Sequence, residues 1–445
     1  MIGNYFWGGA AAPYEIEQSL RFNSADSAYL NRTPASSGST TTWTISCWVK
    51  RAALGSSQMI WSAGTSGITY LTFNADDTLK LRNSTVEYTT NWKFRDPSAW
   101  YHILLKWDTT NGTQADRAIL YVNGRALGTG DYSTYDKATS SEASTWNTNV
   151  AHSLGRYAYN GTSYLSGYLA EVNFIDGTAL APTDFGEEDD NGVWRPIKYA
   201  GSYTGNSFYL KFASGDGTDS SGLSNTWTAN NFTTSGSGTD VMSDTPTTNW
   251  CVMNPNDNGT SNITLSNGNL SFAAVTTWDR GVKGTFAVSS GKWYWEYEHG
   301  TISSGNNPGA DLGITKYTSM INSHPNGGAT STDSYILAAD DGDLHNGSYT
   351  GTSYGSAAAS GDIISIALDL DNGKIWWGKN GTWFNSGNPA SGTNAGYTGL
   401  SGTFFPLWYW GISPGIYGVN LAPGFNFGQR DFEDQHGTTI YLNKG

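Results

Sequence analysis

Carboxylates form the densest group of residues that could do chemistry in this chain. Asp340, Asp341 and Asp343 lie within four positions, with Gly342 between the last two. Acidic loops of this kind supply the oxygen ligands that Ca²⁺ takes, although the alternating spacing of an EF-hand loop is missing. Asp and Gly are also typical turn residues. The sequence therefore predicts either a tight turn or a structural calcium site at these three aspartates.

Residues for catalysis are not paired in a usable way. A glycosidase needs two carboxylates on facing elements, whereas Glu171 stands alone in an apolar stretch. None of the six histidines lies in a His-Glu-x-x-His motif, and no Gly-x-Ser-x-Gly elbow is present. His102 alternates with core residues of its strand, which favours a hydrogen-bonded structural role. We therefore expect that the chain is not an enzyme and needs no cofactor besides the calcium considered above.

Aromatic loops are the stronger signal, because Trp and Tyr rings stack on ligands while Asn, Asp and Gly nearby supply hydrogen bonds. Three tyrosines cluster in GRYAYNGTSY, Trp61 and Tyr70 flank a Gly/Ser loop, and Trp376 stands beside Trp377 between two turn signals. Packing or subunit contact is the alternative interpretation for each group. The predicted ligand-binding residues are Trp61, Tyr70, Tyr157, Tyr159, Tyr164 and Trp376.

Composition excludes several classes of partner. The 445 residues carry 24 Lys and Arg against 38 Asp and Glu, a formal net charge of −14. Nucleic-acid binding relies on Lys and Arg to neutralise phosphates, so no nucleic acid is expected as a partner. No apolar run is long enough to cross a bilayer, and the N-terminal MIGNYFWGGAAAPYEIEQ lacks the regions of a signal peptide. We expect no membrane insertion, and free buried thiols at Cys47 and Cys251.

The elements that position these residues are strands. Thr42–Lys50 and Ile364–Leu370 alternate apolar and other residues at the strand period, and Asn-Gly or Asp-Asn-Gly turns follow many such runs. No amphipathic helix longer than two turns is evident. The sequence predicts an all-β fold of two antiparallel, jelly-roll-like β-sandwiches joined by a Gly/Ser/Thr-rich connector. The predicted parts are an N-terminal attachment segment at 1–18, a first sandwich at 19–185, a connector with short strands at 186–269 and a second sandwich at 270–445.

Five short motifs follow one another in the first region: LRF at 20–22, WTISCWVK at 43–50, WYHIL at 100–104, LYVNG at 120–124 and GYLAEV at 167–172. In this order they resemble the laminin G-like, concanavalin A-type lectin/glucanase domains. The motifs are mostly core and turn residues, so the resemblance implies the fold more than the ligand. Glucanases of this fold carry a Glu-x-Asp-x-x-Glu strand, and no such run occurs here.

The last region carries a second series: GKWYWEYE at 291–298, DLGI at 311–314, YILAADDGDLHNG at 335–347, GDIISIALDLDNGKIWWGKNG at 361–381 and NFGQRDF at 426–432. This series resembles SPRY domains, with Trp377 at a usual Phe position. The resemblance implies a curved sandwich in which Trp377 is a core residue and Trp376 lies on the opposite face. Both families are mostly binding modules.

The segment FIDGTALAPTDFGEEDDNGVWRPIKYAG at 174–201, followed by NSFYLKF, resembles a connector of bacteriophage structural proteins. This likeness implies a virion protein of the tail-fibre, spike or head-fibre type, assembled in the host cytoplasm. The aromatic residues Tyr5, Phe6 and Trp7 would dock into another virion protein, since exposed rings are more stable when covered. Capping of the chain's own first sandwich is the alternative.

Three functions follow in order of preference. The first is host attachment as a homo-oligomer on the particle, through a host-surface glycan or protein. The second is a purely structural role, as capsid decoration or tail scaffold without a specific ligand. The third and weakest is a carbohydrate-active enzyme. Fold alone does not decide among them.

Overall fold

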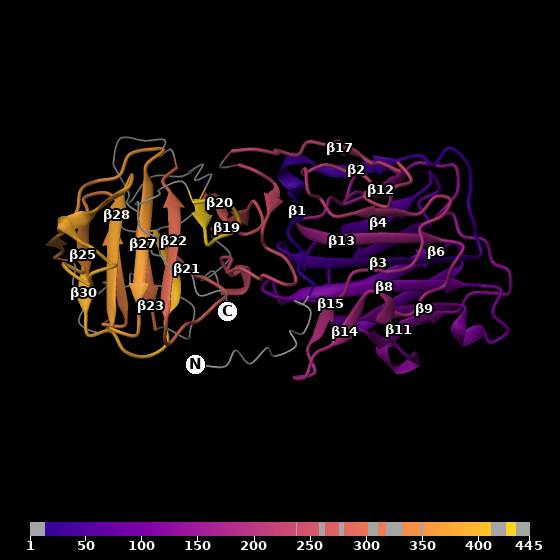
Figure 1. Cartoon of the computed structure of the whole chain (residues 1–445), viewed down its shortest axis with the longest axis horizontal. Helices are drawn as coiled ribbons and strands as arrows, with labels where there is room; N and C mark the ends of the chain where they lie inside the picture. The colour runs from indigo at the N-terminus through magenta and orange to yellow at the C-terminus, as the bar shows by residue number, and fades with distance from the viewer. Residues whose placement is uncertain are drawn as a thin grey trace, which may run out of the picture.

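The computed structural model describes residues 14–432, apart from 237, 258–262, 276–279, 301–309, 317–331, 348–349 and 411–423. The described residues form strands and short 3-10 turns, with no α-helix among them. Figure 1 shows two β-sandwiches, the first in indigo to magenta and the second in orange to yellow. The predicted all-β fold is confirmed. The 3-10 turns are η1 (Ser24–Asp26), η2 (Gln114–Asp116), η3 (Thr129–Asp131), η4 (Pro182–Asp184), η5 (Pro255–Asp257) and η6 (Phe384–Ser386).

One sheet of the first sandwich, which we call sheet A, has eight strands. They are β1 (Ser19–Phe22), β3 (Thr42–Arg51), β8 (Trp100–Asp108), β9 (Ala118–Val122), β10 (Arg125–Ala126), β13 (Gly167–Asp176), β16 (Phe208–Leu210) and β18 (Val241–Met242). Their order is β10-β9-β8-β3-β13-β1-β18, and β16 pairs with the second half of β13. Asn123 and Gly124, with φ of 48° and 77°, form the tight turn between β9 and β10.

The facing sheet, sheet B, also has eight strands. They are β2 (Tyr29–Arg32), β4 (Gln58–Ala63), β5 (Thr69–Phe73), β6 (Thr78–Asn83), β7 (Val86–Lys93), β11 (Tyr132–Asp136), β12 (His152–Leu154) and β17 (Thr228–Asn230). Their order is β11-β7-β6-β5-β4-β12-β2-β17. Alternation places Leu30 and Leu71 in the core and leaves Tyr29 and Tyr70 on the outer face, partly exposed.

Tryptophans fill the space between the two sheets. Trp43 stacks on Trp107 at 5.6 Å between ring centroids, and Trp61 stacks on Trp146 at 5.1 Å. Phe174 contacts both pairs, through Trp43 and Trp61. All four tryptophans are at most 1% exposed. This aromatic core fixes the separation of the sheets and holds β4 against the strands of sheet A.

The short strands predicted within 186–269 largely join the first sandwich. β16 extends sheet A, β17 pairs with β2 at the end of sheet B, and β18 pairs with β1. β14 (Gly186–Glu188) and β15 (Trp194–Pro196) form a separate ribbon. Trp194 of this ribbon donates from Nε1 to Nδ1 of His102 at 3.0 Å. Over most of its length the predicted connector is therefore a part of the first sandwich.

The second sandwich has two six-stranded sheets and a hairpin. The first sheet is β21 (Arg280–Lys283), β31 (Phe405–Trp410), β23 (Ala310–Thr315), β24 (Ser334–Ala338), β25 (Asp343–His345) and β26 (Thr352–Ser353), in that order. The second is β29 (Thr382–Trp383), β28 (Lys374–Lys379), β27 (Ile363–Asp369), β22 (Lys292–Glu298) and β32 (Gly424–Asn426), with β30 (Tyr397–Thr398) beside β28. The hairpin is β19 (Ile263–Ser266) and β20 (Ser271–Val275).

The paired tryptophans lie in the hairpin of β27 and β28. Trp377 points into the core and donates from Nε1 to the carbonyl of Leu312 at 2.9 Å. Trp376 points to the other face and donates from Nε1 to the carbonyl of Thr393 at 2.7 Å. Both rings are 0% exposed. The predicted core position of Trp377 is confirmed, and the loop around Thr393 closes over Trp376.

The segment around residues 243–249, which we call the linking segment, contacts both sandwiches. Lys50 of β3 is fully buried and places Nζ 2.7 Å from Oδ2 of Asp244 and 2.8 Å from Oδ1 of Asn249. One residue earlier, the amide and hydroxyl of Ser243 donate to the carbonyls of Gln429 and Gly428. The linking segment is therefore fixed on both sides.

Candidate functional site

The loop between β12 and β13 carries three of the tyrosines predicted to bind a ligand. It turns tightly, because the amide of Tyr157 donates to the carbonyl of Thr162 and the amide of Gly161 donates to the carbonyl of Tyr157, both at 2.9 Å. Gly161 allows this turn with φ of 70°. Tyr159 lies at the tip and is 52% exposed, the most open large side chain of the loop. The turn therefore holds a tyrosine ring out into solvent.

The loop is anchored to sheet B rather than loose. Ser62 of β4 donates from Oγ to the carbonyl of Arg156 at 2.7 Å and accepts the amide of Ala158 at 2.8 Å. The hydroxyl of Tyr157 donates to the carbonyl of Gly67 at 2.5 Å. Partial burial is the main cause that raises the pKa of Tyr157, and the neighbouring Tyr70 raises it further. This hydroxyl therefore stays protonated at neutral pH. These bonds reduce the ordering cost that a ligand would otherwise meet.

Aromatic rings from three elements meet on this outer face. Tyr70 of β5 contacts Tyr157 at 5.6 Å between centroids, and Tyr157 contacts Tyr159 at 5.8 Å. Tyr29 of β2 contacts Tyr164 at 6.2 Å. The guanidinium of Arg156 lies 3.6 Å from the centroid of the Tyr29 ring, a cation–π contact. We call Tyr29, Tyr70, Arg156, Tyr157, Tyr159 and Tyr164 the tyrosine patch.

The patch has the chemistry of a binding surface. Its rings offer apolar faces with little conformational freedom, and their hydroxyls and the guanidinium supply hydrogen bonds. Asn31 and Asn230, on neighbouring strands of the same sheet, are hydrogen-bonded to each other at 2.7 Å. Flat rings beside amides and one cation suit a sugar ring or a flat protein surface. Nothing in the patch supplies a nucleophile or a pair of carboxylates.

Four of the predicted ligand-binding residues are thus brought together: Tyr70, Tyr157, Tyr159 and Tyr164. Sequence reasoning missed Tyr29 and Arg156. Strand alternation was the available signal for Tyr29, since Leu30 beside it faces the core. Arg156 adjoins Tyr157 directly in the chain.

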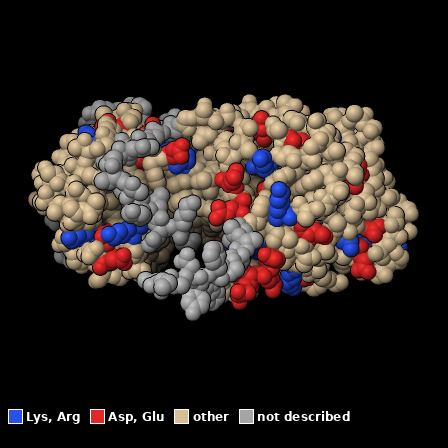
Figure 2. Space-filling view, viewed as in Figure 1, with Lys and Arg blue, Asp and Glu red and all other residues tan. Residues whose placement is uncertain are grey.

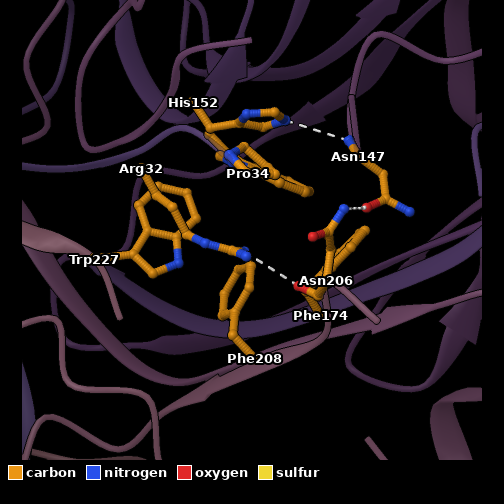
Figure 3. A pocket seen from close by; sticks show the side chains of 9 residues that line it. Arg32, Pro34, Asn147, His152, Phe174, Asn206, Phe208 and Trp227 are labelled. Carbon is orange, nitrogen blue, oxygen red and sulfur yellow. Dashed lines mark hydrogen bonds between the residues drawn. The ribbon is translucent and has the colours of Figure 1, made fainter. Parts of the chain in front are cut away.

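The ligand-stacking role predicted for Trp61 is not supported by its position. Its ring is 1% exposed and lines a cavity of about 10 Å³, space for one water molecule at most. Figure 3 shows the polar side of this cavity, where the amide of Asn147 donates to His152 and Arg32 donates to the carbonyl of Asn206. The bond from Arg32 ties a loop of the predicted connector, at Asn206, to sheet B. Trp376 is equally closed, at 0% exposure.

The acidic run behaves as a turn in the described residues. Oδ1 of Asp341 accepts the amide of Asp343 at 2.8 Å, the pattern of an Asx turn. No group of three or more His, Cys, Asp or Glu side chains within the described ranges is placed to hold a metal. The calcium site predicted at Asp340, Asp341 and Asp343 is not supported by this arrangement.

The predicted attachment residues Tyr5, Phe6 and Trp7 lie outside the described residues. The part of the N-terminal segment that is described packs on its own sandwich. Ile16 is buried beside Trp48 and Tyr168, and its amide donates to Oγ1 of Thr247 at 3.0 Å. Among the described residues, no helix has the length and apolarity to cross a membrane.

Charged side chains are sparse on the face of the molecule in Figure 2, where blue and red groups lie scattered on a mostly uncharged surface.

The side chains of His102 and the two cysteines are all buried, so none of them presents a reactive group to solvent. Burial lowers the pKa of His102 to about 3, so the ring is neutral. Its Nε2 lies 2.7 Å from Oγ of Ser46, as the predicted structural role requires.

Comparison with known families agrees with this geometry. Residues 23–184 match the concanavalin A-like lectin/glucanases superfamily, and residues 292–413 match the SPRY domain. The chain therefore carries a lectin-like domain followed by a SPRY domain, as the motifs predicted. Domains of these two kinds suggest a binding function.

Solved structures that resemble parts of this chain share little of its sequence. The SPRY domain of human HERC1 is 18% identical over 38% of this chain and 98% of its own, with a TM-score of 0.29. A heptameric SAP-like pentraxin from Limulus polyphemus is 18% identical over 38% of this chain and 80% of its own, also with a TM-score of 0.29. A comparison with curated proteins finds no match.

Proposed function

We propose that this chain is a bacteriophage virion surface protein that attaches the particle to a host-cell glycan or surface protein through the tyrosine patch. One observation supports this most directly. Four aromatic residues chosen from the sequence, from two separate segments, meet on one outer face, and hydrogen bonds from Ser62 and Tyr157 fix the loop that carries them. This anchoring holds the rings in place before a ligand arrives, which lowers the entropy cost of binding.

The virion context is supported by the 174–201 segment and its resemblance to a phage connector. Repeated copies on a particle would convert weak binding by one patch into avid adhesion, since linked sites raise the effective concentration of each other. The lectin-like domain would face the host. Binding through the patch requires neither catalysis nor a cofactor.

Replacing Tyr157, Tyr159 and Tyr164 together with Ala should weaken saturable binding of the purified protein to host cells at least tenfold. Each ring that is lost removes stacking area and a hydroxyl. The measurement is binding of fluorescently labelled protein to a panel of bacterial strains and to their purified envelope polysaccharides. Tyr159→Ala alone should give a smaller loss, because its ring is half exposed.

Val193→Ala is the matched control, because Val193 is also 52% exposed and lies in the separate ribbon of β14 and β15, outside the tyrosine patch. Its binding should equal that of the unchanged protein. Thermal unfolding checks that each variant is folded. Equal binding by the triple variant, or no saturable binding to any strain while the protein assembles tightly with other virion proteins, would reject attachment through the patch and favour the structural role.

A further inference from the structure

A second pocket lies on the outer face of sheet A. Its volume is about 350 Å³, within the usual range for small-molecule sites. The described end of the N-terminal segment forms one wall, and the residues around β16 form the other. The lining residues are Tyr14, Glu15, Ile16, Glu17, Gln18, Glu171, Asn173, Lys198, Tyr199, Tyr203, Tyr209, Lys211, Ala213 and Ser220.

Glu171 of β13 is the central group of this pocket. Its side chain is only 7% exposed, and its two carboxylate oxygens accept the hydroxyls of Tyr14 at 2.9 Å and of Tyr209 at 2.5 Å. Close by, the hydroxyl of Tyr203 donates to Oδ1 of Asn173 at 2.5 Å. A carboxylate has about four acceptor positions, and the two tyrosine hydroxyls use two of those on Glu171.

The backbone is distorted to place Glu171 there. Ala170 pairs with Trp48 and Asn173 with Ser46, so Glu171 and Val172 together oppose the single residue Cys47. Glu171 has φ of 50°, a conformation that non-glycine residues adopt at a cost. The bulge turns Val172 into the core and Glu171 outwards. Bulges re-aim side chains at functional positions.

The balance of charges indicates what the pocket would take. Lys198 and Lys211 oppose a cationic ligand, whereas Glu171, Glu15 and Glu17 oppose an anionic one. The remaining polar lining is rich in hydroxyls, from four tyrosines and Ser220, which both donate and accept. A neutral molecule with several hydroxyls matches this mixture, and the tyrosine rings offer faces against which a sugar ring would pack.

We propose that this pocket is a binding site for a small, neutral, polyhydroxylated ligand, one or two sugar rings or another polyol, with Glu171 as its main hydrogen-bond acceptor. The site is independent of the tyrosine patch, which lies on sheet B. It would recognise a short saccharide end or a free sugar, whereas the patch would contact an extended surface.

The first experiment measures binding of the full chain to a panel of neutral mono- and disaccharides and linear polyols, by ligand-observed NMR and calorimetry. A uronic acid and an amino sugar are the charged comparisons. We expect saturable binding of at least one neutral compound and at least tenfold weaker binding of its charged analogues. Glu171→Gln and Tyr14→Phe should each weaken binding about tenfold or more, while Tyr159→Ala should leave it unchanged.

Glu171→Gly separates binding from structure. Glycine relieves the positive φ but removes the acceptor of the Tyr14 and Tyr209 hydroxyls, and these two effects on stability oppose each other. The thermal midpoint should therefore change little, while ligand binding is lost. A clear fall in the midpoint would mark Glu171 as a structural acceptor for the two tyrosines and overturn the proposal. Absence of binding to every neutral compound, or equal binding by Glu171→Gln, would also overturn it. Loss on Tyr159→Ala with no effect of Glu171→Gln would place the sugar at the patch instead.

Discussion

Replacing Lys50 with Met should lower the free energy of unfolding of the first sandwich by about 3–5 kcal/mol, the usual cost of removing one partner of a buried ion pair. Lys50 and Asp244 are both 0% exposed, with Nζ and Oδ2 2.7 Å apart. Trp100 also donates from Nε1 to Asp244 at 3.0 Å. Burial raises the pKa of Asp244 and Lys50 lowers it, so removal of the lysine leaves an acid that must be protonated or reach water. Urea denaturation followed by tryptophan fluorescence measures the change.

The double variant Lys50→Met with Asp244→Asn is the control. It removes both charges and keeps an acceptor for Trp100, so most of the lost stability should return. An exposed pair, Arg125 with Asp131 at 3.0 Å, provides the comparison, since Arg125→Met should cost less than about 1 kcal/mol. A loss below about 1 kcal/mol for Lys50→Met would mean that Asp244 finds water or another donor, and that the pair does not hold the linking segment.

Acidification should destabilise the first sandwich through its two buried histidines. Burial lowers the pKa of His102 to about 3 and of His152 to about 4, against an ordinary value of about 6.5. At a pH between the folded and the unfolded pKa, each imidazole binds a proton in the unfolded chain but not in the folded chain. Stability is fully present above pH ~6.5 and falls as the pH drops from there towards the folded pKa of each ring, by about 1.4 kcal/mol per pH unit for each histidine.

The test is the pH dependence of urea unfolding for the unchanged protein and for His102→Gln. The glutamine side chain keeps an acceptor for Trp194 and a partner for Ser46, and it has no titratable group. Buried acids act in the opposite direction, because burial raises the pKa of Glu171 and of Asp311. The difference between the two proteins isolates His102 from these acids. Parallel curves between pH 6.5 and 4 would show that His102 is protonated in the folded state and that its environment is wetter than its burial implies.

The sandwiches could be predicted because long strands repeat their pattern. The ten residues of β3 alternate clearly, and the Asp-Asn-Gly turn before β28 predicts its hairpin. The role of 186–269 could not be predicted in the same way. β16, β17 and β18 have two or three residues each, too few to show a period, and their partners lie far away in the chain.

The two proposed binding surfaces also differ in how well the sequence predicts them. Most of the tyrosine patch lies in one loop, so composition alone points to it. The pocket around Glu171 depends on the hydroxyls of Tyr14 and Tyr209, which come from distant segments. Strict alternation from Leu169, a core residue, would place Glu171 inside the sandwich. Only the bulge opposite Cys47 turns the Glu171 side chain outwards, and no residue pattern in β13 predicts this bulge.

The pairing of β1 also has a consequence for the order of synthesis. Leu20 pairs with Leu169 on one side and with Val241 on the other. On a ribosome, β1 emerges first and must wait for both partners, while the strands of sheet B between them can already form hairpins. Contacts so distant in sequence fold slowly and leave strand edges open to other chains in the meantime. Translation beyond β18, rather than the end of the lectin-like domain, therefore sets the moment at which this sandwich can close.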